Sequence, residues 1–238
     1  MNLAEAQKLD GEDPLASYRD LFFIEDDDLI YLDGNSLGRM PKTTIDKINI
    51  FLKQEWGRNL IQSWDSWIHL PRKLGDQLAQ HLLGAEAGEV IISDTVTLNI
   101  YKILSHCIDR GRTILITNKN NFPTDRYIIQ RLQKRFNHLS PSLNIQELFF
   151  EMDPVDAVTA DDIKNILKTV DGRKTVFLLS HVDFRSGALA DMAMINKLIH
   201  QHHGIVIWDL CHSVGAVPIA LNKCDSDFAV GCTYKYLN

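Results

Sequence analysis

Short apolar runs, rich in β-branched residues, recur along the chain and predict buried strands. Each run stops abruptly at polar residues, as a strand buried on both faces of a parallel sheet does at its loop end. The predicted strands are Glu89–Ile92, Thr113–Thr117, Ile145–Phe150, Thr175–Leu179, Ile205–Trp208 and Phe228–Cys232. Because these runs are buried without alternating polar positions, they indicate a sheet that is covered on both faces.

Amphipathic segments with the helical period separate most of these runs. Thr159–Asp162 resembles a capping box, and the residues after it, beginning with Ile163, place apolar side chains at helical spacing. A later segment through Ile195 and Ile199 has the same period and stops at Gly204. The alternation of strands and helices predicts an α/β fold, a mostly parallel sheet with helices on both faces in an α/β/α sandwich.

The part of the chain before the first of these strands has a different pattern. Its opening residues are polar and acidic, and Leu29–Leu32 predicts one short strand that runs into a turn rich in Gly and Asn. Helices are expected over Leu15–Phe23, from Pro41 to near Gly57, and over Arg72–Leu83. We therefore expect an N-terminal arm with helices over residues 1–60 and a larger α/β domain over residues 61–238.

Composition narrows the classes of function. The chain is 45% hydrophobic and 24% charged, with a net charge of -6, which argues against a nucleic-acid-binding surface. No apolar run approaches the length of a membrane span, and the acidic N-terminus lacks the apolar stretch of a secretory signal. The four cysteines lack metal-type spacing, which fits free thiols in a reducing cytoplasm. Neighbouring histidines in His200–His203 point in different directions on a helix, so we expect no metal site.

Two of the predicted strands end in residues that can carry chemistry. Ile205–Trp208 is followed by Asp209 and His212, and Phe228–Cys232 is followed by Tyr234 and Lys235. Taken singly, an Asp at such a place is more often a turn or cap residue, and a Lys is more often solvated. Together they would meet at the carboxyl edge of the sheet, where ligands bind in open α/β folds. This combination suggests pyridoxal phosphate (PLP), which needs a Schiff-base lysine and an Asp at its pyridinium nitrogen.

A possible anion site follows the Glu89–Ile92 run. Thr95, Val96 and Thr97 stand where a helix begins, and the free N–H groups of a helix start bind anions such as phosphate. The alternative is that Thr95 or Thr97 only caps the helix. The chain has neither a G-x-G-x-x-G motif nor a Walker lysine, so dinucleotide and ATP binding lose their usual support.

Further candidate residues lie beyond two other strands. Phe122 follows the Thr113–Thr117 strand, just before a proline that begins a helix. It would lie at the same edge as Asp209, where an aromatic face can stack on a flat ring, although a buried Phe is the common alternative. Ser180, directly after Thr175–Leu179, adds another polar group at that edge.

Five pieces of the sequence together resemble the kynureninase family. In chain order they are Tyr31–Gly38, Thr97–Asn99, Phe122–Asp125, Asp209–Gly215 and Tyr234–Asn238. They occur in the family's order and spread over nearly the whole chain. The family consists of fold-type-I PLP enzymes related to the class V aminotransferases, so the resemblance implies the large domain of a PLP-dependent transferase.

The resemblance implies a role for each candidate in catalysis. Lys235 would form the Schiff base with PLP and shuttle the proton at the substrate Cα, and Tyr234 would be the acid and base for cleavage. Asp209 would pair with the pyridinium nitrogen, and His212 would support the ring's oxygen side or that Asp. Ser36 would contact the substrate.

The resemblance also implies the remaining cofactor contacts. Val96 and Thr97 would bind the phosphate, helped by Ser180 and Tyr234. Phe122 would stack on the ring, with Asp125 orienting groups near it. The implied PLP contacts are Val96, Thr97, Phe122, Pro123, Thr124, Asp125, Ser180, Asp209, His212, Tyr234 and Lys235.

The implied reaction is the hydrolysis of L-kynurenine, or 3-hydroxykynurenine, to anthranilate, or 3-hydroxyanthranilate, and L-alanine. An enzyme that catalyses this reaction is a hydrolase acting on a C–C bond, in tryptophan catabolism and NAD biosynthesis. The family also implies a cytoplasmic homodimer. Family members continue beyond the Tyr234–Asn238 motif, so we expect that a C-terminal small domain, with the arginine that grips the substrate carboxylate, is absent from this chain.

Two alternatives to this reading remain open. The chain could be a truncated, catalytically impaired kynureninase-like fragment that binds PLP or a partner chain without turnover. A related PLP lyase such as a cysteine desulfurase would need a catalytic cysteine outside these residues. The Tyr31–Gly38 and Tyr234–Asn238 pieces argue against that second alternative.

Overall fold

The computed structural model describes residues 2–153 and 155–238, which form two compact units. The first unit comprises the chain up to Ile68 together with Tyr234–Asn238. The second unit is His69–Thr233 and contains the sheet. The division into an arm over residues 1–60 and a domain over residues 61–238 stays a prediction.

The second unit is built on a five-stranded sheet with the order β2-β1-β3-β4-β5, in which every neighbouring pair is parallel. Its strands are β1 (Ile114–Asn118), β2 (Gln146–Phe150), β3 (Thr175–Ser180), β4 (Ile205–Asp209) and β5 (Phe228–Val230). The predicted parallel sheet is therefore confirmed, with strand ends within a few residues of those expected.

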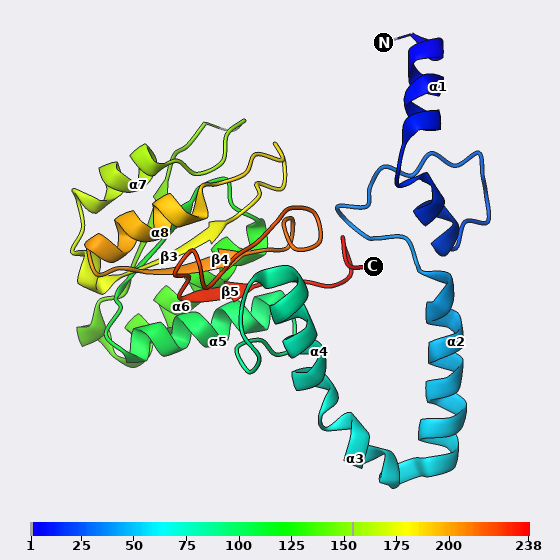
Figure 1. The fold of residues 1–238 in the computed structure, drawn as a ribbon. Helices are drawn as coiled ribbons and strands as arrows, with labels where there is room; N and C mark the ends of the chain where they lie inside the picture. The colour runs from blue at the N-terminus through cyan, green and yellow to red at the C-terminus, as the bar shows by residue number, and fades with distance from the viewer. Residues whose placement is uncertain (1, 154) are drawn as a thin grey trace. The chain divides into compact units, whose positions relative to one another are not determined.

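Helices cover both faces of this sheet, as predicted. Figure 1 shows α5 (Val96–Asp109) and α6 (Pro123–Leu139) on one side and α7 (Ala160–Leu167) and α8 (Met192–Gln201) on the other. The core lies between these layers, where apolar side chains of helices and strands exclude water. Its fully buried members include Ile100, Leu104, Leu115, Ile129, Leu132, Ile163, Phe177, Leu178, Ile195, Ile207 and Trp208.

Short local signals determine where the covering helices begin. The predicted capping box of α7 is present: the Asp162 N–H donates to Thr159 Oγ1 at 3.2 Å, and the Thr159 N–H donates to Asp162 Oδ2 at 2.9 Å. Asp191 caps α8 in a related way by accepting from the Met194 N–H at 2.9 Å. Each cap satisfies N–H groups that have no partner inside the helix.

The second unit also holds α4 (Leu70–Leu78), which continues as the π-helical turn η4 (Ala79–Leu83). This helix ends at Gly84, whose φ of 58° is left-handed and favours glycine. Two short 3₁₀ turns complete the unit, η5 (Pro141–Leu143) and η6 (Gly172–Lys174).

Two strand predictions are wrong. Glu89–Ile92 forms no strand; its Ile91 is 66% exposed, and the Ile92 N–H donates to the Pro71 carbonyl at 3.1 Å. Leu29–Leu32 also forms no strand. An apolar run becomes a strand only when another strand lies alongside to pair with its backbone, and β-propensity alone does not supply that neighbour.

The first unit is mostly helical. Its elements are α1 (Leu3–Glu12), η1 (Ala16–Leu21), α2 (Lys42–Ile50), η2 (Phe51–Asn59), η3 (Leu60–Ser63) and α3 (Trp64–Trp67). The helix expected over Leu15–Phe23 is only the 3₁₀ turn η1, whereas the helix expected from Pro41 forms and extends past Gly57. Sequence reasoning missed α1, although Asn2 and Glu5 form a capping box at its start. Across the described residues, helices fall short of the length and apolarity needed to cross a membrane.

Candidate active site

The order of the strands places a topological switch point at one edge of the sheet. From β1 the chain passes outward to β2 and then returns to β3 on the other side, so β1 and β3 flank the point where the strand order reverses. Ligands in such sheets bind at the carboxyl ends of the strands beside this point. Here β1 ends at Asn118 and β3 ends at Ser180, which is in register with Asp209 at the end of β4.

A hydrogen-bond network links the residues that follow β1 to the end of β3. The Ser180 hydroxyl donates to Asn121 Oδ1 at 2.8 Å, and Asn121 Nδ2 donates to Thr117 Oγ1 at 2.9 Å. Asn121 Oδ1 also accepts the Phe122 N–H at 2.7 Å. Asn121 is 2% exposed and was not among the predicted site residues. It lies three residues after Asn118, the last residue of β1, in the loop that leads to Phe122.

Ring side chains of the loops after β1, β3 and β4 contact one another. The rings of Phe122 and Phe184 meet edge to face with centroids 5.3 Å apart, and Phe184 lies 6.3 Å from the His212 ring. Phe122 remains 40% exposed, so part of its ring is accessible to a flat ligand. Phe184 was missed by sequence reasoning, because nothing in its local pattern separates it from an ordinary loop aromatic residue.

Asp209 places a buried carboxylate at the end of β4. The residue is 7% exposed, and its Oδ1 accepts the Cys211 N–H at 2.8 Å. The Asp209 carbonyl accepts the His181 N–H at 3.0 Å, which ties the end of β4 to the residue that follows β3. Because a buried carboxylate is costly without a cation or donors, this position suits a partner that carries a cationic N–H.

His181 is a second buried polar residue at this edge. It is 5% exposed, and its ring lies 5.9 Å from the Trp208 ring. Burial lowers its pKa below the usual value of 6.5, so the neutral form is favoured. Its Nδ1 is buried and has no hydrogen-bond partner among residues 2–153 and 155–238. A buried nitrogen of this kind is available to a ligand, and sequence reasoning did not single it out.

The start of α5 supplies backbone donors at the same edge. Because α5 runs directly into β1 and packs antiparallel to it, the N-terminus of α5 lies at the carboxyl edge of the sheet. Thr95 caps the helix by accepting the Leu98 N–H at 3.2 Å, which is the capping alternative considered for the sequence. The N–H groups of Val96 and Thr97 fall in the first turn, outside the intrahelical ladder.

Asp94, just before the start of α5, is negatively charged and would repel an anion bound there. Its carboxylate binds Lys102 and accepts the Ser93 hydroxyl at 2.9 Å. The hydrogen bond from Lys102 is the main reason that the pKa of Asp94 lies below its usual range. Lys102 therefore compensates the negative charge of Asp94 beside the first turn of α5.

The Phe122–Asp125 motif forms the start of α6 and is partly buried. Phe122 is the N-cap residue, Pro123 and Thr124 open the helix, and Asp125 is 1% exposed in the first turn. The Asp125 N–H donates to the Phe122 carbonyl at 3.1 Å. Pro at the first helical position fits because that residue needs no N–H donor.

Two cysteines lie beside Asp209 in the buried end of the sheet. Cys232 Sγ is 4.0 Å from the Cys211 carbonyl oxygen, and both residues are buried. The hydrogen bond with Cys232, then burial and the charge of Asp209, raise the pKa of Cys211 far above its usual value. This thiol is therefore protonated and unreactive, because the thiolate is the nucleophilic form.

The remaining predicted residues belong to the first unit. Lys235 is 8% exposed, and its Nζ lies 6.0 Å from the centroid of the Tyr234 ring, which is 53% exposed. Ser36 lies in a turn in which its N–H donates to the Asp33 carbonyl at 2.9 Å. The same loop reaches the lysine segment through the Gly38 N–H, which donates to the Tyr234 carbonyl at 2.8 Å.

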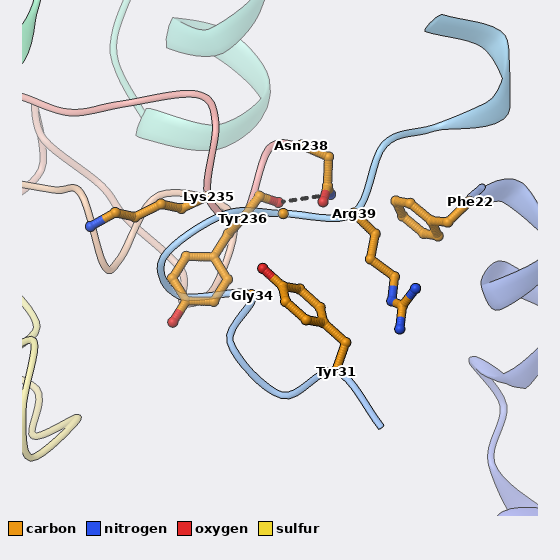
Figure 2. Close-up of a pocket in the computed structure, with 8 residues that line it drawn as sticks. Phe22, Tyr31, Gly34, Arg39, Lys235, Tyr236 and Asn238 are labelled. Carbon is orange, nitrogen blue, oxygen red and sulfur yellow. Dashed lines mark hydrogen bonds between the residues drawn. The ribbon is translucent and has the colours of Figure 1, made fainter. Parts of the chain in front are cut away.

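A pocket of about 240 Å³ lies within the first unit. Tyr31, Arg39, Lys235 and Tyr236 are among its lining residues, and Figure 2 shows the Lys235 side chain extending away from the Tyr31 ring. The Arg39 guanidinium lies 5.1 Å from the centroid of the Tyr31 ring. The structure thus places the predicted residues in two groups, one at the sheet edge of the second unit and one around Lys235 in the first.

Comparison with known proteins gives the following likenesses. A kynureninase of Burkholderia pseudomallei (strain K96243) is 40% identical over 242 residues, covering 98% of this chain and 54% of its own length. The apo structure of a cysteine desulfurase from Thermococcus onnurineus NA1 has a TM-score of 0.68 at 16% identity, covering 97% of this chain and 53% of that chain. A C-DES mutant with glycine covalently linked to its PLP cofactor has a TM-score of 0.67 at 18% identity, covering 85% of this chain and 52% of that chain.

The two structural likenesses show a shared fold. The chain spans about half the length of the curated relatives that it matches. The family model described as Aminotransferase class-V matches residues 30–238, which include every element of the sheet and the Lys235 segment. The chain therefore belongs to the class-V aminotransferase family.

Proposed function

We propose that this protein uses PLP to hydrolyse L-kynurenine, or 3-hydroxykynurenine, to anthranilate, or 3-hydroxyanthranilate, and L-alanine. The observation that carries the proposal is the 40% identity to a kynureninase over 98% of this chain. The reaction would belong to tryptophan catabolism and NAD biosynthesis. The structural likeness to cysteine desulfurases, at 16% identity, supports the fold and does not favour a desulfurase activity.

The residues at the carboxyl edge of the sheet fit PLP. The buried Asp209 carboxylate suits the pyridinium N–H, and the half-exposed Phe122 ring suits stacking on the cofactor ring. The first-turn N–H groups of Val96 and Thr97 suit the phosphate. When bound, PLP supplies a ring that takes up electrons from the substrate bond being broken. The His181 Nδ1, which has no hydrogen-bond partner among the residues that the structure describes, adds one more polar group that could bind a ligand.

The other implied contacts lie at the same edge of the sheet as Asp209 and Phe122. Ser180 ends β3 and would support the phosphate, and His212 follows β4 and would support the ring's oxygen side. Pro123 and Thr124 shape the start of α6, and Asp125 is buried in its first turn, where it would orient groups near the ring.

Lys235 would hold the cofactor covalently and move the proton at the substrate Cα. It follows Val230, the last residue of β5, by five residues, and a chain of that length spans at most about 18 Å. Lys235 is itself buried, at 8% exposed, and its side-chain amine is the group that would attack the cofactor.

Tyr234 would supply and take up protons at the substrate carbonyl. The γ-carbonyl of kynurenine must add water before the bond to Cβ breaks, so an acid and base beside that oxygen is required. The Tyr234 phenol is 53% exposed and adjacent to Lys235 in the chain, which supports this role. Ser36, in the turn linked through Gly38 to Tyr234, would contact the substrate.

We also propose that the protein acts as a cytoplasmic homodimer. The first unit exposes large apolar side chains on consecutive elements of the chain, and large exposed apolar areas typically mark a protein interface. They include Trp56 at 61%, Leu60 at 60%, Ile61 at 73%, Trp64 at 54% and Ile68 at 63% exposed. All four cysteines are free thiols, which fits a reducing compartment.

The test joins a chemical label to an activity assay. The full-length protein with PLP should release fluorescent anthranilate from kynurenine, and borohydride should fix PLP irreversibly on the peptide that contains Lys235. Lys235→Ala should lose both signals. Lys197→Ala, which changes an exposed lysine on α8, should keep both.

Three outcomes separate the hypotheses. No anthranilate from the full-length protein, or a borohydride label on another lysine, would contradict the proposed function. PLP fixed on Lys235 without turnover by the 238-residue chain would favour the alternative of a catalytically impaired PLP-binding fragment. Substantial turnover by this chain would exclude that alternative.

A further inference from the structure

The turn that contains Ser36 is in direct backbone contact with the segment that carries Lys235. The Gly38 N–H donates to the carbonyl oxygen of Tyr234 at 2.8 Å. This carbonyl belongs to the peptide bond that leads into Lys235, so the hydrogen bond restrains the backbone at the lysine Cα. A side chain as long as lysine keeps one orientation only when its Cα is fixed, because it has several rotatable bonds.

Gly38 also has a steric reason to be glycine. A Cβ at this position would overlap the backbone carbonyl oxygen of Lys235 and the side-chain oxygen of Asn238, and would lie 2.9 Å from Asn238 Cγ. The Asn238 side chain can rotate away. The Lys235 carbonyl is backbone, and it cannot yield without moving Lys235 itself. Only glycine, which has no Cβ, lets two backbone segments come this close.

The turn that presents Gly38 is itself held in shape. The Tyr31 hydroxyl lies 2.6 Å from the Leu37 carbonyl and 3.1 Å from the Asp33 carbonyl, so it can donate to either. The Leu37 N–H donates to the Asp33 carbonyl at 3.2 Å. Figure 2 shows the Tyr31 ring beside the Tyr236–Asn238 end of the lysine segment. The restraint on Lys235 therefore comes from a formed turn and not from a mobile loop end.

We propose that Gly38 is a positioning residue for Lys235. Its N–H and its missing side chain set the backbone of Tyr234 and Lys235, and thereby the direction in which the lysine amine is presented. This inference rests on the proposed function, in which that amine holds PLP and moves a proton at the substrate. Displacing a reacting group by about 1 Å can reduce a rate by about 100-fold.

Two glycines of the same turn make a matched pair for the test. Gly38→Ala adds the Cβ that meets Lys235, whereas a Cβ at Gly34 meets no atom within 4 Å. Neither glycine is among those with positive φ, so the intrinsic backbone cost of alanine is similar at both. Any difference between the two variants therefore reports the contact with the lysine segment.

The full-length protein with PLP serves for the first measurement. Gly38→Ala should reduce kcat by about tenfold or more, and reduce the fraction of PLP that borohydride fixes on Lys235, with less than about a twofold change in KM. It should also shift the pH at which the visible band of lysine-bound PLP titrates. Gly34→Ala should match the wild type in kcat, KM, the fraction of PLP fixed on Lys235 and the pH at which the band titrates. Equal behaviour of the two variants would overturn the proposal.

Amide hydrogen exchange gives a readout that needs no PLP. Gly38→Ala should accelerate exchange over Tyr234–Asn238, and Gly34→Ala should not. If Gly38→Ala fails to fold, Tyr31→Phe replaces it in the test. Loss of the Tyr31 hydroxyl loosens the turn, so this variant should also lower the fraction of PLP that borohydride fixes on Lys235. An unchanged fraction would overturn the proposal. A wild-type protein that does not attach PLP to Lys235 refutes the proposed function, whereas wild-type attachment with an unaffected Gly38→Ala refutes only the positioning role.

Discussion

At the scale of the residue, burial determines what the polar groups at the sheet edge can do. Asp209 and His181 are 7% and 5% exposed; Asp209 ends β4 and His181 follows β3, and all but one residue of each strand are buried. In such surroundings a carboxylate needs a cationic partner and an imidazole prefers to be neutral. Sequence reasoning found Asp209 because it ends an apolar run. It passed over His181 because its burial depends on packing against Trp208.

Replacing Asp209 with Asn tests the pairing with the cofactor ring. The amide keeps the shape and can still accept the Cys211 N–H, but it carries no charge to hold the ring nitrogen protonated. We expect kcat to fall by about tenfold to a hundredfold, the value of a charge-assisted hydrogen bond. Steady-state assays with kynurenine measure this. Asp161→Asn, an exposed carboxylate on α7, is the control, and an equal loss in both variants would contradict the assignment.

His181 should make stability depend on pH. Its folded pKa lies below the unfolded value of 6.5, so the unfolded state binds more protons as the pH falls. The stabilising effect is complete above 6.5 and is lost as the pH decreases from 6.5 through the lower folded pKa. Thermal melts of the protein without PLP should therefore show a smaller decrease in Tm between pH 7 and pH 5 for His181→Gln than for the wild type. Parallel curves for the two proteins would show that His181 does not titrate on unfolding.

At the scale of the element, local sequence signals predicted helix starts better than strand partners. The capping box at Thr159 and Asp162 forms as expected, because both residues lie within one turn. The apolar run Glu89–Ile92 was expected as a strand on equally good local grounds and forms none. A strand needs backbone partners from a distant part of the chain, and a helix does not.

Thr159→Ala should destabilise the second unit by about 1 kcal/mol, because the Asp162 N–H loses its acceptor. Urea unfolding followed by circular dichroism gives the free energy. Asn165→Ala, which removes only an exposed contact with Lys168 on the same helix, should cost less than about 0.5 kcal/mol. Equal costs at the two positions would mean that the cap does not stabilise α7.

At the scale of the whole molecule, the exposed apolar side chains of the first unit support the proposed homodimer. A stable protein interface buries about 800 Å² on each partner, and large aromatic and aliphatic side chains dominate its centre. The exposed side chains of Ile61 and Trp64 have this character. We expect the full-length protein to associate as a homodimer through them.

Light scattering measures this association. The wild type should have the mass of two chains, and the double variant Ile61→Glu with Trp64→Glu should be monomeric, because two charges would be buried without partners. Leu139→Glu, at an equally exposed position at the end of α6, should remain dimeric. A wild-type protein with the mass of one chain would contradict the proposed homodimer.

The sequence by itself determined the parallel α/β fold and the positions where chemistry can occur. Apolar runs that end in Asp209, Ser180 and the residues before Lys235 are local patterns, and a parallel strand reveals its loop end without reference to its neighbours. Only the tertiary structure decided the order β2-β1-β3-β4-β5, and with it the switch point between β1 and β3. It also brought Asn121 against Ser180, and Gly38 against Lys235. These contacts join residues far apart in the chain, and hydrophobic periodicity carries no information about which distant backbone a residue will meet.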